Sequence, residues 1–127
     1  MKYSSFSEMI VTNTGLENIP NWNQIDNLKR LINDLLDPIR EKWGKPIRVN
    51  SGFRSERVNE AIGGARNSQH KTGEAADITT GNPTDNKRLF EMIASSGLTY
   101  DQLIDEKNYQ WIHISLSTRN RQQILHL

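Results

Sequence analysis

The sequence contains no cysteine among its 127 residues, so disulfide bonds and thiolate metal sites are excluded. This absence does not decide the compartment, because a chain without cysteine is compatible with either redox environment. Long apolar runs are also missing. No stretch approaches the length of a membrane span, and residues 1–8 lack the apolar core of a signal peptide. We therefore expect a soluble protein that is made in the cytoplasm and has no membrane partner.

An excess of charge of one sign is missing as well. Lysine and arginine together number 16 against 15 acidic residues, which gives a net charge of +1, and neither sign forms a long run. A nucleic acid or a charged membrane surface is therefore not indicated as a partner. The chain has the size of one ordinary domain. We expect a single domain over residues 1–127 that is a monomer, with a wrapping segment at 1–23 and a polar tail at 116–127.

The clearest periodicity begins at Gln24, where apolar residues start to recur at steps of three and four and so share one stripe of a helix. They are Ile25, Leu28, Ile32, Leu35, Leu36, Ile39 and Trp43. Pro38 removes a backbone donor inside this helix, and we expect a kink or a break near Asp37. Gly44 should end the helix and be followed by a strand at 47–51.

Shorter elements follow along the chain. Ser55 is suited to cap a short helix that stops at two glycines, and residues 65–71 should form a loop. A short strand is expected at 74–78. Thr84 should then cap a helix that ends before Gly97.

Two segments carry the residue types of a metal site. Residues 68–77 read Ser-Gln-His-Lys-Thr-Gly-Glu-Ala-Ala-Asp, and residues 111–115 read Trp-Ile-His-Ile-Ser. Together they supply His70, Asp77 and His113, and two imidazoles with one carboxylate form a ligand set of catalytic zinc sites. The same set suits other transition metals. The short spacing of the first two residues also fits a surface histidine and an acid at the edge of the core.

Residues 102–106 and 111–115 are predicted to form a hairpin with a four-residue turn. Glu106 would then lie opposite Trp111, and both would share one face of the hairpin with His113. On this register Glu106 is diagonal to His113, at about 7 to 8 Å, a separation that a zinc ion and its water can bridge. This makes Glu106 the candidate general base. The alternative is a solvated charge at the end of a hairpin.

Arg54 follows the predicted strand at 47–51 in a glycine-containing turn, Ser-Gly-Phe-Arg-Ser at 51–55. A strand that ends in such a turn often presents a side chain to a pocket. The alternative for Arg54 is a surface salt bridge, since most arginines are solvated.

The order of these segments resembles the M15 family of zinc D-Ala-D-Ala carboxypeptidases and related phage endolysins. The resemblance rests on residues 51–55, on the pattern Ser-x-His-x-x-Gly-x-Ala-x-Asp at 68–77, on Gln-Leu-Ile at 102–104 and on 111–115. The resemblance covers the chain from about residue 6 to residue 115. It implies an α+β fold in which an antiparallel sheet has flanking helices and one zinc ion lies on one face.

The resemblance also implies roles for particular residues. His70, Asp77 and His113 would bind the zinc ion, Arg54 would hold the carbonyl or carboxylate of the substrate, and Ser68 would support the ligand loop. The residues expected to contact the substrate are Arg54, Ser68, Gln69 and Trp111. The substrate would be the peptide stems of bacterial peptidoglycan, cut by a carboxypeptidase or an endopeptidase.

One position departs from the family pattern. Several members carry a carboxylate that acts as base three residues before the last histidine ligand, and this chain has Gln110 there. An amide cannot accept the proton. We expect Glu106 to substitute, because it can share a face with His113. The alternatives are a metal-retaining module that binds wall peptide or a protein partner without turnover, and a small structural domain with incidental histidines.

The start of the chain bears on where such an enzyme would act. A wall-cleaving enzyme without an export signal would meet its substrate only after lysis, through a holin or as part of a phage particle. On this ground we expect a phage or prophage origin.

Overall fold

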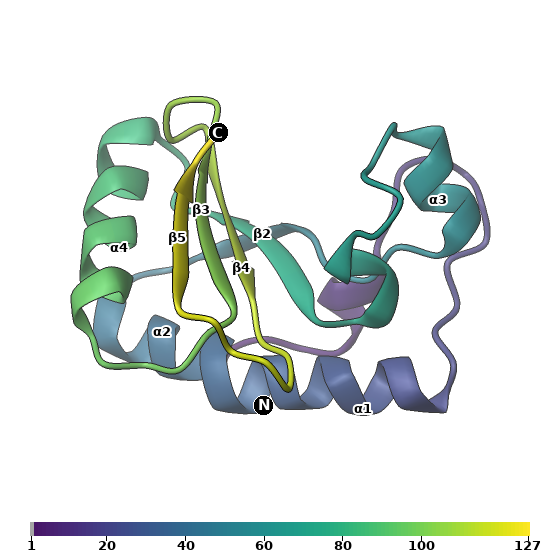
Figure 1. The fold of residues 1–127 in the computed structure, drawn as a ribbon, viewed down its shortest axis with the longest axis horizontal. Coiled ribbons are helices and arrows are strands. Elements are labelled where there is room, and N and C mark those ends of the chain that lie inside the picture. Colours follow the sequence, from purple (N-terminus) through teal and green to yellow (C-terminus); the bar gives the residue numbers. More distant parts are fainter. Residues whose placement is uncertain (1) are drawn as a thin grey trace.

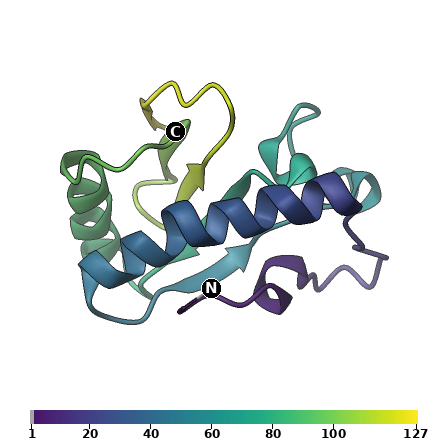
Figure 2. The same cartoon turned by 90° about the horizontal axis from the view of Figure 1, so that it is seen from below.

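The apolar residues that recur from Gln24 onward lie on one continuous helical segment, residues 22–43, which we call the rod. The rod lies beneath the sheet in Figure 1 and runs across it in Figure 2. The computed structural model describes residues 2–127. The rod begins with α1 (Trp22–Leu31), slightly earlier than expected, because Asn21 and Gln24 form a capping box. The Asn21 side chain accepts from the Gln24 N–H, and the Gln24 side chain accepts from the Asn21 N–H.

Pro38 disturbs this rod, as predicted, but the disturbance lies earlier in the chain than expected. Ile32–Leu36 is a π-helical turn, and α2 (Asp37–Trp43) then continues the rod with Pro38 in its first turn. Proline lacks an N–H and crowds the preceding turn, so the wider turn lies ahead of it. Gly44 ends the rod, as predicted, in the left-handed conformation with a φ of 77°.

Five strands form one sheet in the order β1-β2-β4-β3-β5. They are β1 (Arg48–Ser51), β2 (Ala75–Thr79), β3 (Gln102–Glu106), β4 (Trp111–Ser115) and β5 (Gln123–His126). The hairpin of β3 and β4 has the predicted register, with Glu106 opposite Trp111. Strand β2 lies antiparallel to β4 and brings Asp77 opposite His113.

The sheet is mixed rather than wholly antiparallel, because β5 runs parallel to β3. The prediction of an antiparallel sheet is therefore corrected at this edge, and the expected polar tail contains a strand. Tertiary partners hold this strand: His126 Nδ1 lies 3.0 Å from Asp105 Oδ2, and the Leu127 N–H donates to the Asp105 carbonyl at 2.8 Å. Local periodicity does not reveal an edge strand that depends on such partners.

The segment from residue 2 to residue 10 contacts the core and the rod. A short 3-10 helix, η1 (Ser7–Ile10), buries Met9 completely in the core. The Asp37 carboxylate accepts hydrogen bonds from the backbone N–H groups of Tyr3 and Ser4, at 3.2 and 3.0 Å. The segment is thus held against the rod.

Two short helical elements lie between β1 and β2 in the chain. Helix α3 (Glu56–Ala61) begins after Ser55, whose side chain accepts from the Val58 N–H, as predicted for its N-cap. The stretch expected to be a loop contains a 3-10 turn, η3 (Gln69–Thr72). This turn fixes the backbone around His70.

Helix α4 (Pro83–Ser95) begins before Thr84, which was expected to cap it. The N-cap is Asn82, whose side chain accepts from the Asp85 N–H at 2.8 Å, and Pro83 takes the first helical position. Proline suits that position because its missing N–H would have no helical partner there.

The two faces of the sheet differ in their neighbours. Residues at alternate positions of β3 and β4 pack with the rod and α4 into the core; among them are Leu103, Ile112 and Ile114, each fully buried. The residues between them face the opposite side, which the rod and α4 leave open. No helix within residues 2–127 has the length and apolar character needed to cross a membrane.

Candidate metal centre

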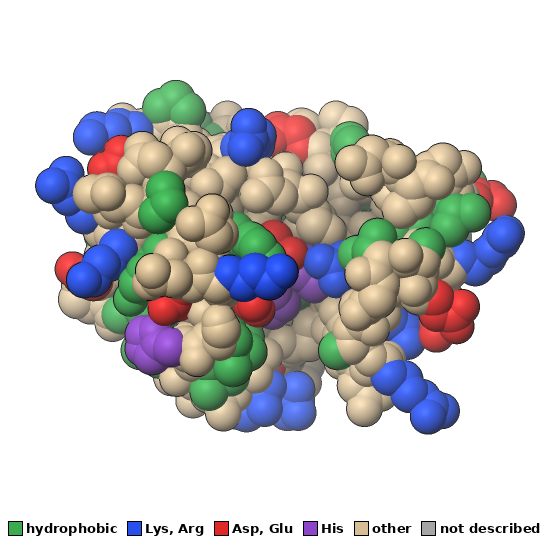
Figure 3. Space-filling model, turned by 90° about the horizontal axis from the view of Figure 1, so that it is seen from above, with side chains coloured by type: hydrophobic (Ala, Val, Ile, Leu, Met, Phe, Trp, Pro, Cys, Tyr) green, Lys and Arg blue, Asp and Glu red, His purple; other side chains and the backbone are tan. Residues whose placement is uncertain are grey.

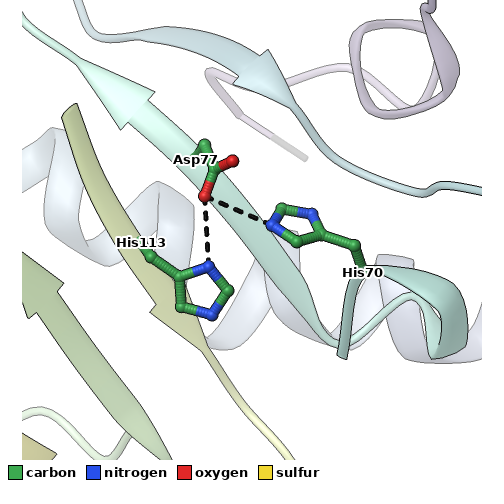
Figure 4. A group of neighbouring side chains, drawn as sticks. All are labelled: His70, Asp77 and His113. Carbon is green, nitrogen blue, oxygen red and sulfur yellow. Dashed lines mark hydrogen bonds and ion pairs between the residues drawn. The ribbon is translucent and has the colours of Figure 1, made fainter. Parts of the chain in front are cut away.

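Three side chains meet on the open face of the sheet, each from a different element (Figure 4). His70 comes from η3, Asp77 from β2 and His113 from β4. Asp77 Oδ1 lies 3.2 Å from His70 Nε2 and 3.1 Å from His113 Nδ1. One ligand atom from each residue lies within 4.8 Å of the other two. The fold therefore brings together the three residues that the sequence nominated as ligands.

The orientation of His70 leaves a lone pair directed at the cluster. Its Nδ1 lies 2.7 Å from the carbonyl oxygen of Gly52, which can only accept, so Nδ1 carries the proton of the neutral ring. Nε2 then presents its lone pair to Asp77. Two acceptors facing each other repel unless a second proton or another cation lies between them. The donor set is therefore suited to a shared cation.

The spacing of the donor atoms is compatible with zinc. Zinc takes imidazole nitrogens at about 2.0–2.1 Å and carboxylate oxygens at about 2.0–2.2 Å in a tetrahedral arrangement, so two such ligands lie about 3.4 Å apart. The two nitrogen-to-oxygen distances to Asp77 are 3.2 and 3.1 Å. A zinc ion therefore fits these side chains with small adjustments. Three protein ligands leave one tetrahedral position open.

Asp77 carries a negative charge in this cluster. Burial raises the pKa of Asp77, but hydrogen bonds that His113 and His70 donate when their facing nitrogens carry a proton outweigh burial and hold the pKa well below its usual range. Its second oxygen, Oδ2, accepts a hydrogen bond from Arg54 Nη2 at 3.0 Å. Arg54 thus holds the carboxylate so that Oδ1 faces the two histidines.

Arg54 is built into the site rather than lying at the surface. Its side chain is 13% exposed, and its Nε donates to Ser51 Oγ at 3.0 Å. Burial lowers the pKa of Arg54, while the charges of Asp77 and Glu106 raise it. The sequence left open an exposed salt bridge for Arg54, whereas the structure contains a mostly buried one with Asp77. Arg54 also lines the groove described next, where its predicted contact with substrate stays a prediction.

A groove of about 700 Å³ opens over the cluster. Figure 3 shows this face hollowed between two lobes, with acidic, basic and histidine side chains gathered in the hollow. The sheet supplies one side of the groove through alternate residues of its open face, and the loop that follows α3 supplies another. All four residues predicted to contact substrate line it, namely Arg54, Ser68, Gln69 and Trp111.

The contacts of three of these residues indicate what each does in the fold. Ser68 Oγ accepts from the His70 N–H at 3.2 Å and so caps η3. Gln69 Nε2 donates to Asp101 Oδ2 at 2.7 Å. The ring of Trp111 lies under Lys107, whose Nζ is 5.5 Å from its centroid. Ser68 thus caps the turn that carries His70.

Glu106 and Gln110 differ in their relation to the groove. Glu106 lines it and is close enough to Arg54 for its charge to raise the Arg54 pKa. Its register, opposite Trp111 and two residues along from the partner of His113, is the predicted one. Gln110 is exposed in the turn between the strands and does not line the groove. Of these two positions, only that of Glu106 lies in the groove over the candidate centre.

Sequence reasoning missed Asp101, Arg119, Arg121 and the end of the chain. Arg119, Arg121, Leu125 and Leu127 all line the groove. Asp101 lies behind them, fully buried. The sequence gives no local signal for these residues, because Asp101 and the arginines are separated in the chain and meet only through the fold.

Gly52 supports the site through its carbonyl, which accepts from His70. An alanine Cβ there would lie 2.5 Å from the Met9 carbonyl oxygen, which also accepts from the Phe53 N–H. Gly52→Ala should therefore lose about 1–3 kcal/mol of stability with a chelator present. Displacing the partner of His70 should also weaken zinc affinity about tenfold or more. Thermal denaturation and zinc titration measure the two effects.

Gly44→Ala is the matched control for this prediction. Gly44 has a φ of 77° and open space around its Cα, and it lies at the end of the rod. Its substitution should cost about 1–2 kcal/mol through the left-handed backbone alone and leave zinc affinity unchanged. A Gly52→Ala variant with the melting temperature and zinc affinity of the unmodified protein would contradict the role of Gly52.

Two comparisons with known proteins bear on this arrangement. The first relates 47 residues of the chain to the zinc D-Ala-D-Ala carboxypeptidase of Streptomyces albus G, at 51% identity. The aligned part is 36% of this chain and only 18% of that relative. The second matches residues 3–115 to the family model described as Peptidase M15. That match spans His70, Asp77 and His113 together with most of the fold around them, and the chain belongs to the Peptidase M15 family.

Proposed function

We propose that this chain is a zinc-dependent peptidase that hydrolyses the peptide stems of bacterial peptidoglycan. The observation that carries the proposal is the convergence of His70, Asp77 and His113 in a groove that is also lined by the carboxylate of Glu106. Membership of the Peptidase M15 family supports the reaction class. The substrate class is supported by the name of the Streptomyces relative, a zinc D-Ala-D-Ala carboxypeptidase.

The proposed mechanism assigns one role to each polar group. His70, Asp77 and His113 would hold a single zinc ion, which when bound supplies a water of near-neutral pKa and polarises the scissile carbonyl. Glu106 accepts the proton of the attacking water and returns it to the leaving amine. Arg54 keeps a positive charge beside Asp77 and stabilises the oxyanion that develops on the carbonyl.

The groove favours a peptide over a single amino acid. Its volume is about 700 Å³, and its lining runs along the sheet from Trp111 at the hairpin to Arg119 and Arg121 beyond β4. A carboxypeptidase that binds the end of a stem and an endopeptidase that cuts a cross-linked stem both fit such a groove.

A binding module without turnover is the second candidate. Gln110 favours this candidate, because several members of the M15 family carry a carboxylate base at this position and an amide cannot accept a proton. Such a module would keep zinc and bind wall peptide or a protein partner. Glu106 argues against it, since a carboxylate does line the groove.

The test is digestion of purified peptidoglycan and of a D-Ala-D-Ala-terminated stem peptide, with and without a chelator, followed by mass spectrometry. The zinc content of the same sample is measured in parallel. Cleavage that the chelator abolishes is the expected result, and the fragment masses identify the bond. A zinc-loaded sample that cleaves neither substrate would refute the peptidase and favour the binding module.

A further inference from the structure

A buried carboxylate holds two arginines at one end of the groove. Asp101 is fully buried. Its Oδ1 accepts from Arg121 Nε at 2.8 Å and from the Arg121 N–H at 3.0 Å, and its Oδ2 accepts from Arg121 Nη2 at 3.0 Å. Arg119 Nη2 lies 3.5 Å from the same Oδ2. Both arginines line the groove that contains the candidate metal centre.

This cluster keeps a positive charge on the groove side. Hydrogen bonds from the Arg121 side chain hold the pKa of Asp101 well below its usual range, so the carboxylate is ionised. One carboxylate and two guanidinium groups leave a net charge of +1. The charge faces solvent, because the side chains of Arg119 and Arg121 are 60% and 39% exposed while Asp101 is not exposed at all.

The position of the pair relative to the metal centre follows from strand β4. The Asp101 N–H donates to the carbonyl of Ser115 at 2.7 Å, and Ser115 lies two residues beyond His113 on β4. At about 3.3 Å per residue, the backbone of Asp101, whose carboxylate holds the pair, lies about 7 Å along the strand from His113. An extended peptide in the groove advances by a similar amount per residue. Its second residue from the cleaved bond would therefore reach the arginines.

Arg54, which the resemblance implied would hold the carbonyl or carboxylate of the substrate, is already paired with Asp77. The Arg119 guanidinium is less constrained than that of Arg54, because only its Nη2 lies near a carboxylate, 3.5 Å from Asp101 Oδ2. Guanidinium groups are suited to carboxylates because their planar donors match the two oxygens. The carboxylate-binding role therefore fits the arginine pair better than it fits Arg54.

We propose that Arg119 and Arg121, held by Asp101, form a carboxylate-binding subsite of the groove, which selects peptides with a free carboxylate about two residues from the cleaved bond. This inference rests on the proposed peptidase function. It assigns to the segment between β4 and β5 a role in substrate choice.

The cluster also has a structural role, which the test must separate from binding. The Asp101 carbonyl accepts from the Gln123 N–H at 2.9 Å, so Asp101 helps to hold β5 in the sheet. Arg121 donates three hydrogen bonds to the buried Asp101 carboxylate. Removing its side chain would leave the charge of Asp101 buried without its main partner. Arg119→Gln is the better variant, because it removes charge from the groove and leaves the bonds of Arg121 intact.

The experiment uses a D-Ala-D-Ala-terminated stem peptide with all its carboxylates free, and versions in which each carboxylate in turn is a carboxamide. Binding is measured by titration calorimetry and cleavage by kcat/KM. The unmodified protein should prefer the free carboxylate about tenfold at one position, and Arg119→Gln should reduce that preference about fivefold. Arg119→Lys should retain part of the preference. Added salt should weaken it.

Arg88→Gln is the matched control. Arg88 lies on α4, its side chain is 72% exposed, and it does not line the groove. This substitution should leave the preference unchanged. The melting temperature of Arg119→Gln should match that of Arg88→Gln within a few degrees, which a mainly structural role for Arg119 would not give.

The outcomes separate the subsite from the peptidase function. Cleavage without any preference for a free carboxylate would overturn the subsite and leave the peptidase standing. A preference that persists in Arg119→Gln would also overturn it. A preference in binding that Arg119→Gln removes, without cleavage of any peptide, would support the subsite and refute the peptidase. Neither binding nor cleavage would overturn both.

Discussion

His113→Ala is expected to yield a protein that no longer retains stoichiometric zinc after purification. Losing one of three protein ligands should weaken zinc affinity by more than about a hundredfold, beyond what the loss of an outer partner costs. The melting temperature in zinc-containing buffer should fall by about 10 °C. Zinc at a hundred times its Kd stabilises a protein by about 2.7 kcal/mol, and a domain of this size shifts by about 4 °C per kcal/mol. Metal analysis and thermal denaturation measure the two effects.

His126→Ala is the matched control, since His126 is the third histidine of the chain and lies outside the cluster. It pairs with Asp105 and its side chain is 61% exposed, so its loss should change stability modestly and leave zinc content unchanged. With a chelator present, His113→Ala and the unmodified protein should melt within a few degrees of each other. Stoichiometric zinc in His113→Ala would show that the ligand assignment is wrong.

The parts of the fold that the sequence predicted are those encoded by local patterns. The long helix follows from its apolar stripe, and the hairpin register follows from a turn of four residues between two short strands. Gly44 ends the rod and Ser55 caps α3, because these residue types have one dominant use at helix ends.

The parts that the sequence did not predict depend on partners elsewhere in the chain. Strand β5 exists because Asp101 and Asp105 hold its backbone and His126. The π-helical turn ahead of Pro38 is one of several ways in which a helix can absorb a proline. Asn82 rather than Thr84 caps α4, since Pro83 is better placed at the first helical position.

In the candidate site, too, the sequence predicted some features and not others. His70, Asp77 and His113 could be nominated because two imidazoles and a carboxylate form a ligand set of zinc sites, and because their segments resemble those of the M15 family. Their orientation could not, since it depends on the Gly52 carbonyl and on Arg54, which come from the segment after β1. A sequence can therefore indicate which residues are candidates for a site, while the supporting hydrogen bonds appear only in the fold.

Glu106→Gln is expected to lower kcat by about a thousandfold, within the 10²–10⁴ range of general acid–base catalysis. The amide has almost the same shape as the carboxylate but cannot accept the proton of the attacking water. Glu106 is partly exposed in the groove and is not part of the metal cluster, so the variant should keep its zinc and its melting temperature. Stem-peptide hydrolysis followed by mass spectrometry, with metal analysis of the same sample, measures both.

Gln110→Glu is the companion variant that separates Glu106 from the position at which several family members carry the base. Gln110 is exposed and does not line the groove, so a carboxylate there should change kcat by less than about twofold and should not rescue Glu106→Gln. A large gain of activity in Gln110→Glu would mean that the chain lacks a base and that Glu106 does not replace it. Full activity in Glu106→Gln would assign the proton transfer to another group. Loss in Glu106→Gln without rescue by Gln110→Glu would support Glu106, on the same face as His113, as the base of the proposed reaction.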